Sequence, residues 1–90
     1  MLYLVTYDLH RPGQNYSSLF DAIKSIGEWW HYLESVWLVK TSWNAAQVGE
    51  VLRKHIDEND RLLIVDITGD ATNGWLEQKA WDWINTHISG

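Results

Sequence analysis

The chain contains strand-like segments that are apolar on both of their alternating faces. In the first of them, over residues 2–9, Leu2 and Leu4 occupy even positions and Tyr3 and Val5 occupy odd positions. Successive side chains of a strand point to opposite faces of a sheet, so each face of this strand needs a covering layer. A sheet built from such strands therefore has to be buried on two sides.

The hydrophobic pattern alternates between strand and helix periods in the order β-α-β-β-α-β, and a final helical segment follows. The pattern predicts strands over 2–9, 28–33, 36–41 and 62–68, and helices over 16–26, 44–56 and 74–87. The short link at 34–35 makes the second and third strands an antiparallel hairpin, with room for a bulge or bend.

Several residues mark the ends of the predicted helices. Asn15 or Ser17 is expected to cap the first helix, and Gly27 is expected to end it. Asn44 followed by Gln47 resembles a capping box at the start of the second helix. Residues 10–15 are predicted to form a loop.

This order of elements predicts a single α+β domain over residues 1–90, with a ferredoxin-like βαββαβ core, a four-stranded antiparallel sheet and a C-terminal helix. Both crossover helices would lie on one face of the sheet, and the last helix is too short to cover four strands on the other. Seven Trp, four Tyr and one Phe supply more aromatic surface than so small a chain easily buries. We therefore expect a homodimer in which a second copy covers the remaining surface.

Composition limits the classes of function. The chain has no cysteine, which excludes disulfides and thiolate metal sites, and no apolar run of the ~20 residues that a membrane span needs. No targeting signal is recognisable, so we expect a cytoplasmic protein without membrane contact. Seven Lys and Arg against twelve Asp and Glu give a net charge of −5, which argues against general nucleic-acid binding.

Two stretches of the sequence resemble the CRISPR-associated protein 2 superfamily. They are TYDL at 6–9, at the end of the first strand, and HYLESVW at 31–37. The wider pattern, with WWHYLES at 29–35 and KAWDW at 79–83, is similar to the SinR-like branch of that superfamily. The resemblance implies a small ferredoxin-like homodimer, in a superfamily that includes metal-dependent nucleases and the scaffold subunit of spacer-integration complexes.

The resemblance also places a metal-binding carboxylate at Asp8. In a twofold dimer, two copies of Asp8 would share a cation such as Mg²⁺, whose bound water would attack a phosphodiester of RNA or DNA. His10, two residues later, is a candidate proton shuttle or ligand. The alternatives are that Asp8 accepts hydrogen bonds from backbone N–H groups where the strand ends, and that His10 is simply solvated.

Aromatic residues on the predicted strands are candidates for a dimer interface or for a platform on which bases stack. The alternative is that they fill the core of the chain. These residues are Tyr3, Tyr7, Trp30 and Trp37, with Trp29 beside them.

Two further groups lie towards the C-terminus. Asp66 and Asp70 form either a second carboxylate cluster or a pair that closes a turn. Trp75, Trp81 and Trp83 are expected to anchor the last helix.

Three functions fit these observations. The first is a Mg²⁺-dependent nuclease or endoribonuclease centred on paired Asp8 residues. The second is a non-catalytic dimeric interaction or scaffold module, favoured because the loop after Asp8, usually rich in basic residues in the superfamily, holds only Arg11 beside Pro12 and Gly13. The C-terminal helix stands where many relatives place an extra strand that crosses to the partner, and this difference argues against nucleic-acid binding and the spacer-integration role. The third is a toxin-like ribonuclease akin to virulence-associated protein D.

Overall fold

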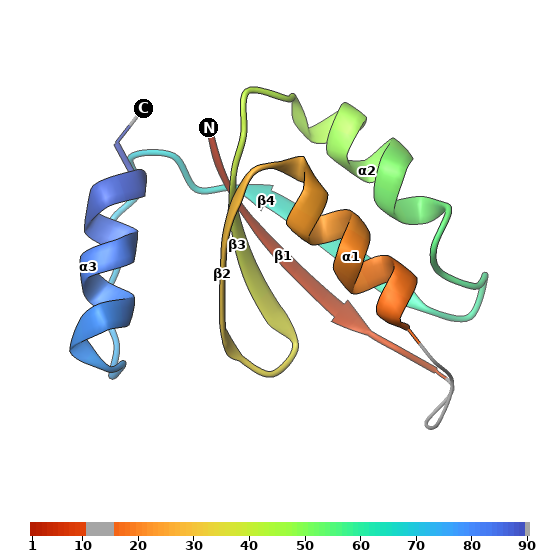
Figure 1. Cartoon of the computed structure of the whole chain (residues 1–90), viewed down its shortest axis with the longest axis horizontal. Helices are drawn as coiled ribbons and strands as arrows, with labels where there is room; N and C mark the ends of the chain where they lie inside the picture. Colours follow the sequence, from red (N-terminus) through yellow and green to blue (C-terminus); the bar gives the residue numbers. More distant parts are fainter. Residues whose placement is uncertain (11–15, 90) are drawn as a thin grey trace.

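The computed structural model describes residues 1–10 and 16–89 of the chain. In this part of the chain, strands and helices follow one another in the order β1, α1, β2, β3, α2, β4, α3 (Figure 1). The α+β architecture predicted from the sequence is confirmed. The elements are β1 Leu2–Asp8, α1 Ser17–Ile26, β2 Glu28–Leu33, β3 Val36–Lys40, α2 Ala45–Arg53, β4 Arg61–Asp66 and α3 Gln78–His87.

The four strands form one antiparallel sheet in the order β2-β3-β1-β4. In the centre of the sheet, Leu4 of β1 is paired with Leu38 of β3 on one side and with Val65 of β4 on the other. The register between β2 and β3 shifts between Trp30 and Leu33. Their hairpin therefore contains an irregularity of the kind expected from the sequence, a bulge or bend.

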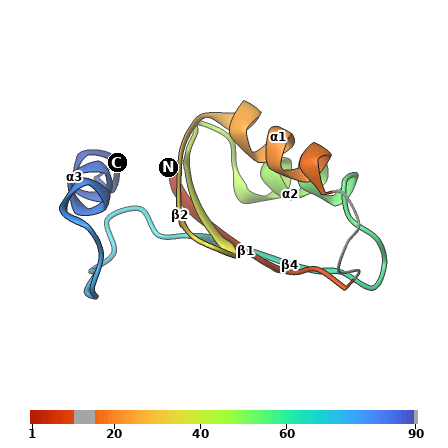
Figure 2. The same ribbon diagram turned by 60° about the horizontal axis from the view of Figure 1, so that its bottom comes forward.

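One face of the sheet packs against α1 and α2, which lie together on the same side of it (Figure 2). Both helices bury apolar residues at helical spacing. From α1 these are Leu19, Ala22, Ile23 and Ile26, and from α2 they are Val48 and Leu52. They meet odd-numbered residues of β1 and β3 that are almost completely buried, namely Tyr3, Val5, Trp37 and Val39.

The opposite face of the sheet carries a second, smaller core beneath α3. In it, Leu2, Trp30 and Leu38 of the sheet pack against Ala80 and Ile84 of α3. The helix stands beside the β2 side of the sheet and leaves β4 uncovered (Figures 1 and 2). The expectation that this helix cannot cover the whole face is therefore confirmed.

The passage from α1 to β2 depends on a close approach of two backbones. Gly27 lies so near Lys40 of β3 that a Cβ atom at position 27 would be 1.9 Å from the Lys40 carbonyl oxygen. No side chain fits into that space, so glycine is required there for a steric reason.

The last helix is shorter than predicted. It begins at Gln78 rather than at residue 74, because Gly74 has a φ of 153° and the N-cap residue Glu77 is extended. Trp75 therefore lies in the linker before α3 and is 96% exposed, so the prediction that it anchors the helix is wrong. Trp81 and Trp83 do pack against the second core.

Strand β2 matches its predicted range, whereas several other element ends differ from the predictions by one to three residues. The first and third strands end one residue early, at Asp8 and Lys40, and α2 ends at Arg53 rather than at Ile56. The fourth strand begins at Arg61 and ends at Asp66 rather than spanning 62–68, because the chain turns at Thr68. The Thr68 hydroxyl donates to the Asp66 carboxylate at 2.6 Å and accepts the Leu2 N–H at 2.8 Å.

The capping box at the start of α2 is confirmed. The Asn44 side chain accepts the Gln47 N–H at 2.8 Å, and the Gln47 side chain accepts the Asn44 N–H at 2.8 Å. The N-cap of α1 is Tyr16 rather than Ser17, and the Tyr16 side chain does not form a capping hydrogen bond. Asn15 and most of the predicted loop, residues 11–15, lie outside the described residues.

Candidate functional site

The part of the second sheet face that α3 leaves uncovered carries a continuous group of apolar side chains. We call this group the open patch. Its members lie on one face because they are paired with each other or with Thr6 on the same face. Leu4 is paired with Val65 of β4, and Thr6 is paired with Leu63 of β4. On the other side, Thr6 is paired with Val36 of β3, which is paired with Leu33 of β2. Leu63 is 57% exposed and Val65 is 40% exposed. The open patch consists of Leu4, Leu33, Val36, Leu63 and Val65.

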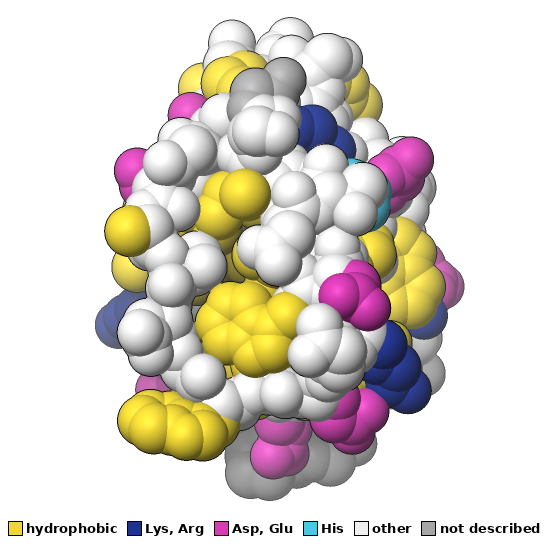
Figure 3. All heavy atoms as spheres, turned by 90° about the vertical axis from the view of Figure 1, so that its left-hand side faces the viewer, with side chains coloured by type: hydrophobic (Ala, Val, Ile, Leu, Met, Phe, Trp, Pro, Cys, Tyr) yellow, Lys and Arg dark blue, Asp and Glu magenta, His cyan; other side chains and the backbone are white. Residues whose placement is uncertain are grey.

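The open patch continues into the second core through Leu4, which packs against that core. Hydrophobic side chains also reach the surface on the side of the molecule where α3 and its linker lie (Figure 3). The linker contributes the almost fully exposed Trp75, and β2 contributes Tyr32, which is half exposed. Exposed apolar surface of this kind is typical of a site that a partner covers.

Asp8 lies at one end of the open patch. It is the last residue of β1, on the same face as Leu4 and Thr6, and it is exposed and paired in register with Arg61 of β4. Asp8 and Arg61 line a shallow hollow of about 280 Å³ together with Leu63. The side chain is therefore at the surface next to exposed apolar residues, where a second subunit seated on the patch would approach it.

His10 is held through its backbone and leaves its side chain exposed. Its N–H donates to a carboxylate oxygen of Asp60 at 2.7 Å. Asp60 thus connects the end of β1 to the turn before β4, a connection that sequence reasoning missed.

The Asp60 carboxylate joins three segments of the chain. Besides the His10 N–H, it accepts the Asp57 N–H at 2.8 Å and the Tyr16 hydroxyl at 3.0 Å. These bonds, first the one from His10, lower the pKa of Asp60 below its ordinary value of 3.8. Only 5% of Asp60 is exposed, so its role is structural. It holds the end of β1, next to Asp8, against the turn that precedes β4.

Replacing Asp60 with asparagine is expected to lower the melting temperature at neutral pH by about 5–10 °C, because a charge-assisted acceptor is lost. A carboxyl group whose pKa is lower in the folded state stabilises the fold above its unfolded-state pKa, and this contribution disappears as the pH falls through the folded-state value. Thermal unfolding at about pH 7 and about pH 3 should therefore show a smaller pH effect in Asp60→Asn than in the wild type.

Asp21→Asn, at an exposed position of α1, is the matched control and should behave like the wild type. An Asp60→Asn protein that loses stability on acidification as steeply as the wild type would contradict the assignment.

The aromatic residues singled out in the sequence are mostly inside the chain. Tyr3 and Trp37 are 1% exposed and belong to the core under α1 and α2, and Tyr7 packs against that core. Trp30 is 3% exposed beneath α3. His31 stacks on Trp37 with ring centroids 3.7 Å apart. These side chains fill the interior of one chain and present little surface to bases or to a partner.

Two aromatic residues of the edge strand β2 are exposed. Trp29 is 42% exposed beneath the ammonium of Lys24, which lies 5.0 Å from its ring, and Tyr32 has Lys79 at 5.2 Å. Trp29 lies on the face of α1, whereas Tyr32 contacts Trp30 on the face of α3. Because they point to opposite faces, they do not form one stacking platform.

Asp66, the last residue of β4, and Asp70 act within a turn. Asp66 accepts the Thr68 hydroxyl at 2.6 Å and the Thr68 N–H at 3.0 Å, and these two bonds, first the one from the hydroxyl, lower its pKa. The Asp70 N–H donates to the Ile67 carbonyl oxygen at 3.0 Å. This arrangement matches the turn-closing alternative.

A separate groove of about 770 Å³ lies between α2 and the edge strand β4. Its floor is apolar, with Ile64 facing Gly49, and its rim carries Glu50, Arg53 and Glu58. It contains none of the residues predicted to carry chemistry, and its charges are of both signs.

Among residues 1–10 and 16–89, no three His, Cys, Asp or Glu side chains are grouped so that they could hold a metal ion. None of the helices in the described part of the chain has the length and apolar character to cross a membrane. No protein-family model matches the chain, and no solved structure matches it significantly.

Proposed function

We propose that this chain is a homodimeric interaction module of the ferredoxin-like type, whose two copies meet through the open patch. The observation that carries the proposal is the exposure of Leu63 and Val65 on a sheet face whose other half is buried under α3. Interfaces combine such an apolar centre with a polar rim, and Thr6, Asp8 and Arg61 supply polar groups beside the patch.

The strand order and connections support the ferredoxin-like assignment. From the opposite edge the order is β4-β1-β3-β2, and each half of the chain joins two strands through one helix, α1 or α2, on the same face. The proposed relationship to the SinR-like branch of the CRISPR-associated protein 2 superfamily rests on the sequence stretches at 29–35 and 79–83.

A second copy of the chain is the occupant that the patch favours. The patch lies on one face of the sheet, so a twofold axis can set the same residues against each other and cover both patches at once. Asp8 and Arg61 are adjacent at one end of the open patch and carry opposite charges. In a twofold dimer, the carboxylate of Asp8 in one subunit can face the guanidinium of Arg61 in the other.

Leu63→Glu is the substitution that tests this interface. Introducing a charge at the centre of an apolar contact should weaken dimerisation by about 100-fold or more, because the carboxylate would be buried without a partner. Size-exclusion chromatography over a range of concentrations, with circular dichroism to confirm folding, measures the effect.

Ala45→Glu is the matched control, because it adds the same charge at an exposed position of α2 and should leave the dimer intact. If Leu63→Glu and wild type elute alike at all concentrations, the patch is not the interface.

A Mg²⁺-dependent nuclease centred on Asp8 is the second candidate. The observation that favours it is the position of Asp8, exposed at the end of β1 on the same face as the open patch. A dimer formed there would bring two carboxylates towards each other, and a hard cation between them would relieve their repulsion.

Incubation of RNA and DNA with the protein, with and without Mg²⁺, tests the nuclease. Asp8→Asn should reduce metal-dependent cleavage to the level measured without metal, whereas Asp21→Asn should not change it. Cleavage that persists in Asp8→Asn would exclude this site. A dimer that shows no cleavage would leave the interaction module as the function.

A further inference from the structure

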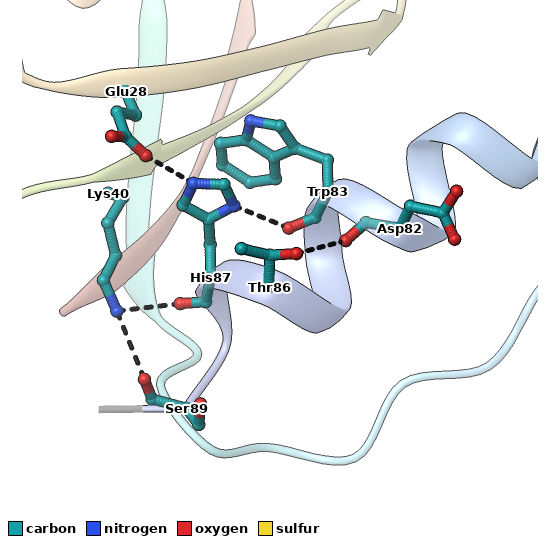
Figure 4. Close-up of polar contacts among 7 residues, drawn as sticks. All are labelled: Glu28, Lys40, Asp82, Trp83, Thr86, His87 and Ser89. Atoms are coloured by element: carbon teal, nitrogen blue, oxygen red, sulfur yellow. Dashed lines mark hydrogen bonds and ion pairs between the residues drawn. The ribbon is translucent and has the colours of Figure 1, made fainter.

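The two edges of the sheet differ in how they are protected. At the β2 edge, the pairing with β3 is irregular between Trp30 and Leu33, and α3 stands beside the strand (Figures 1 and 2). The Glu28 side chain of β2 contacts His87 of α3 (Figure 4). Irregular pairing and a neighbouring helix are devices that keep an edge strand from pairing with another chain.

The β4 edge has a regular backbone and an apolar sequence. β4 is paired with β1 without a register shift from Arg61 to Asp66. Its sequence, RLLIVD, contains no proline, glycine or lysine. Among the described residues, β1 is the only strand that pairs with β4. A regular edge of this kind is a template on which another extended chain can pair.

The side of β4 that faces away from β1 presents backbone groups at alternate residues. The N–H of Ile67, one residue beyond β4, donates to the Leu2 carbonyl oxygen at 2.8 Å. Successive residues of a strand direct their backbone groups to opposite sides, so Val65 shares the orientation of Ile67. Leu62 and Ile64 therefore direct their N–H and C=O groups away from the sheet.

The side chains of the same two residues line the groove of about 770 Å³ between α2 and β4. Ile64 faces Gly49, whose missing side chain keeps the groove open: a Cβ atom at position 49 would lie 3.7 Å from the Cδ1 atom of Ile64. Outward backbone groups and an apolar floor thus lie side by side along one strand.

An extended peptide is the partner that uses both features. Its backbone can pair with the strand edge while every second side chain enters the groove. A helix has its backbone groups bonded internally, so it would leave the edge of β4 unpaired.

The charges on the rim of the groove determine the charge of the peptide. Glu50 of α2 and Glu58 of the turn before β4 are exposed. The Arg61 guanidinium already donates to the carbonyl oxygens of Glu58 and Asp60, at 3.2 and 3.0 Å. Among the described residues that line the groove, this leaves Arg53 as the cation beside two exposed glutamates. An acidic rim on a chain of net charge −5 favours a peptide that carries lysine or arginine.

We propose that the β4 edge and its groove dock an extended, basic peptide segment of another protein, which joins the sheet as an additional edge strand. The peptide backbone pairs with Leu62 and Ile64, and an aliphatic side chain enters the groove over Gly49. Its basic side chains face Glu50 and Glu58. The groove lies on the opposite face of the sheet from the open patch, so docking does not depend on dimerisation.

A ¹⁵N NMR titration of the wild-type protein with a synthetic peptide tests the proposal. The probe has blocked ends, alternates valine with threonine and carries a lysine at each end. The amide signals of α2 and β4 should shift, and the N–H groups of Leu62 and Ile64 should become protected from hydrogen exchange. An absence of shifts at about 1 mM peptide would overturn the proposal.

N-methylated forms of the probe separate strand pairing from general apolar contact. Methyl groups on alternate peptide nitrogens remove every N–H that points to one side of the peptide. Methylation of one alternate set should abolish binding, and methylation of the other set should preserve it. Equal effects of the two sets would contradict strand addition.

A probe with glutamate in place of both lysines tests the role of the rim. It should bind about tenfold more weakly than the lysine probe at about 0.15 M salt, and the difference should shrink at about 1 M salt. Equal binding of the two probes at the lower salt concentration would refute the assigned preference for a basic peptide.

Gly49→Leu fills the groove from the protein side. The added side chain should weaken binding of the lysine probe about tenfold or more, while circular dichroism confirms that the protein is folded. Ser18→Leu, at an exposed position of α1, is the matched control and should bind the probe like the wild type. Unchanged binding by Gly49→Leu would mean that the groove is not the docking site.

The same measurements distinguish this docking site from the open patch. A protein that sediments as one chain and still binds the probe would support the docking site and contradict the proposed dimer. A dimer that does not bind the probe would have the opposite meaning. Protection of the Leu62 and Ile64 N–H groups at high protein concentration without peptide would show that a second copy occupies the edge, and the proposed peptide partner would then be wrong.

Discussion

Trp37→Ala is expected to lower the free energy of unfolding by about 4 kcal/mol. Trp37 is 1% exposed at the centre of the first core, where His31 stacks on it and Phe20 lies 5.9 Å away. Its indole N–H also donates to the Tyr7 hydroxyl at 3.1 Å. Removing the ring creates a cavity and leaves Tyr7 without this donor, so two separate contributions are lost. Urea denaturation measures the change.

Trp75→Ala is the matched control for this substitution, since it removes the same side chain from a position that is 96% exposed. It should change the stability of the monomer by no more than about 0.5 kcal/mol. Equal losses in the two variants would mean that the assignment of Trp37 to the core is wrong.

Gly27→Ala is expected to destabilise the fold by about 3 kcal/mol, although it adds only one methyl group. The new Cβ would lie 1.9 Å from the Lys40 carbonyl oxygen, and that oxygen belongs to the backbone of a strand paired on both sides. Neither backbone can move without breaking sheet pairing, so the overlap cannot be relieved by a change of rotamer. Thermal and urea unfolding provide the measurement.

Gly49→Ala in α2 is the corresponding control. Its Cβ would meet the Ile64 side chain at 3.7 Å, an ordinary contact, and alanine is the better helix former. We expect a gain of about 0.5–1 kcal/mol. The account of Gly27 fails if both substitutions prove equally tolerated.

Features that depend on residues close together in the chain could be predicted from the sequence. The capping box of Asn44 and Gln47 spans a single helical turn, and the apolar stripe of α1 follows directly from helical spacing. The two-faced character of β1 was also readable, because the alternation of side chains in a strand depends only on position.

Features that depend on distant contacts could not be predicted in this way. Asp60 appeared to be one of several acidic residues in a polar turn, yet its partners His10 and Tyr16 are 50 and 44 residues away. The sequence pattern places the start of α3 too early because Leu76 has helical spacing with Ala80, whereas the backbone at Gly74 departs from the helix.

The aromatic residues singled out in the sequence are mostly buried in the structure. The sequence indicates that the second sheet face needs cover, but the path of the linker determines which part α3 covers. That path buries Trp30 and leaves Leu63 and Val65 exposed. The open patch is therefore made of aliphatic residues from all four strands rather than of Tyr3, Trp30 or Trp37.

The solution mass of the wild-type protein tests most directly whether a second copy covers the open patch. Sedimentation equilibrium at micromolar concentration should give twice the 10.5 kDa of one chain. A mass equal to one chain throughout the concentration range would contradict the account, because the apolar surface of Leu63 and Val65 would then remain in water.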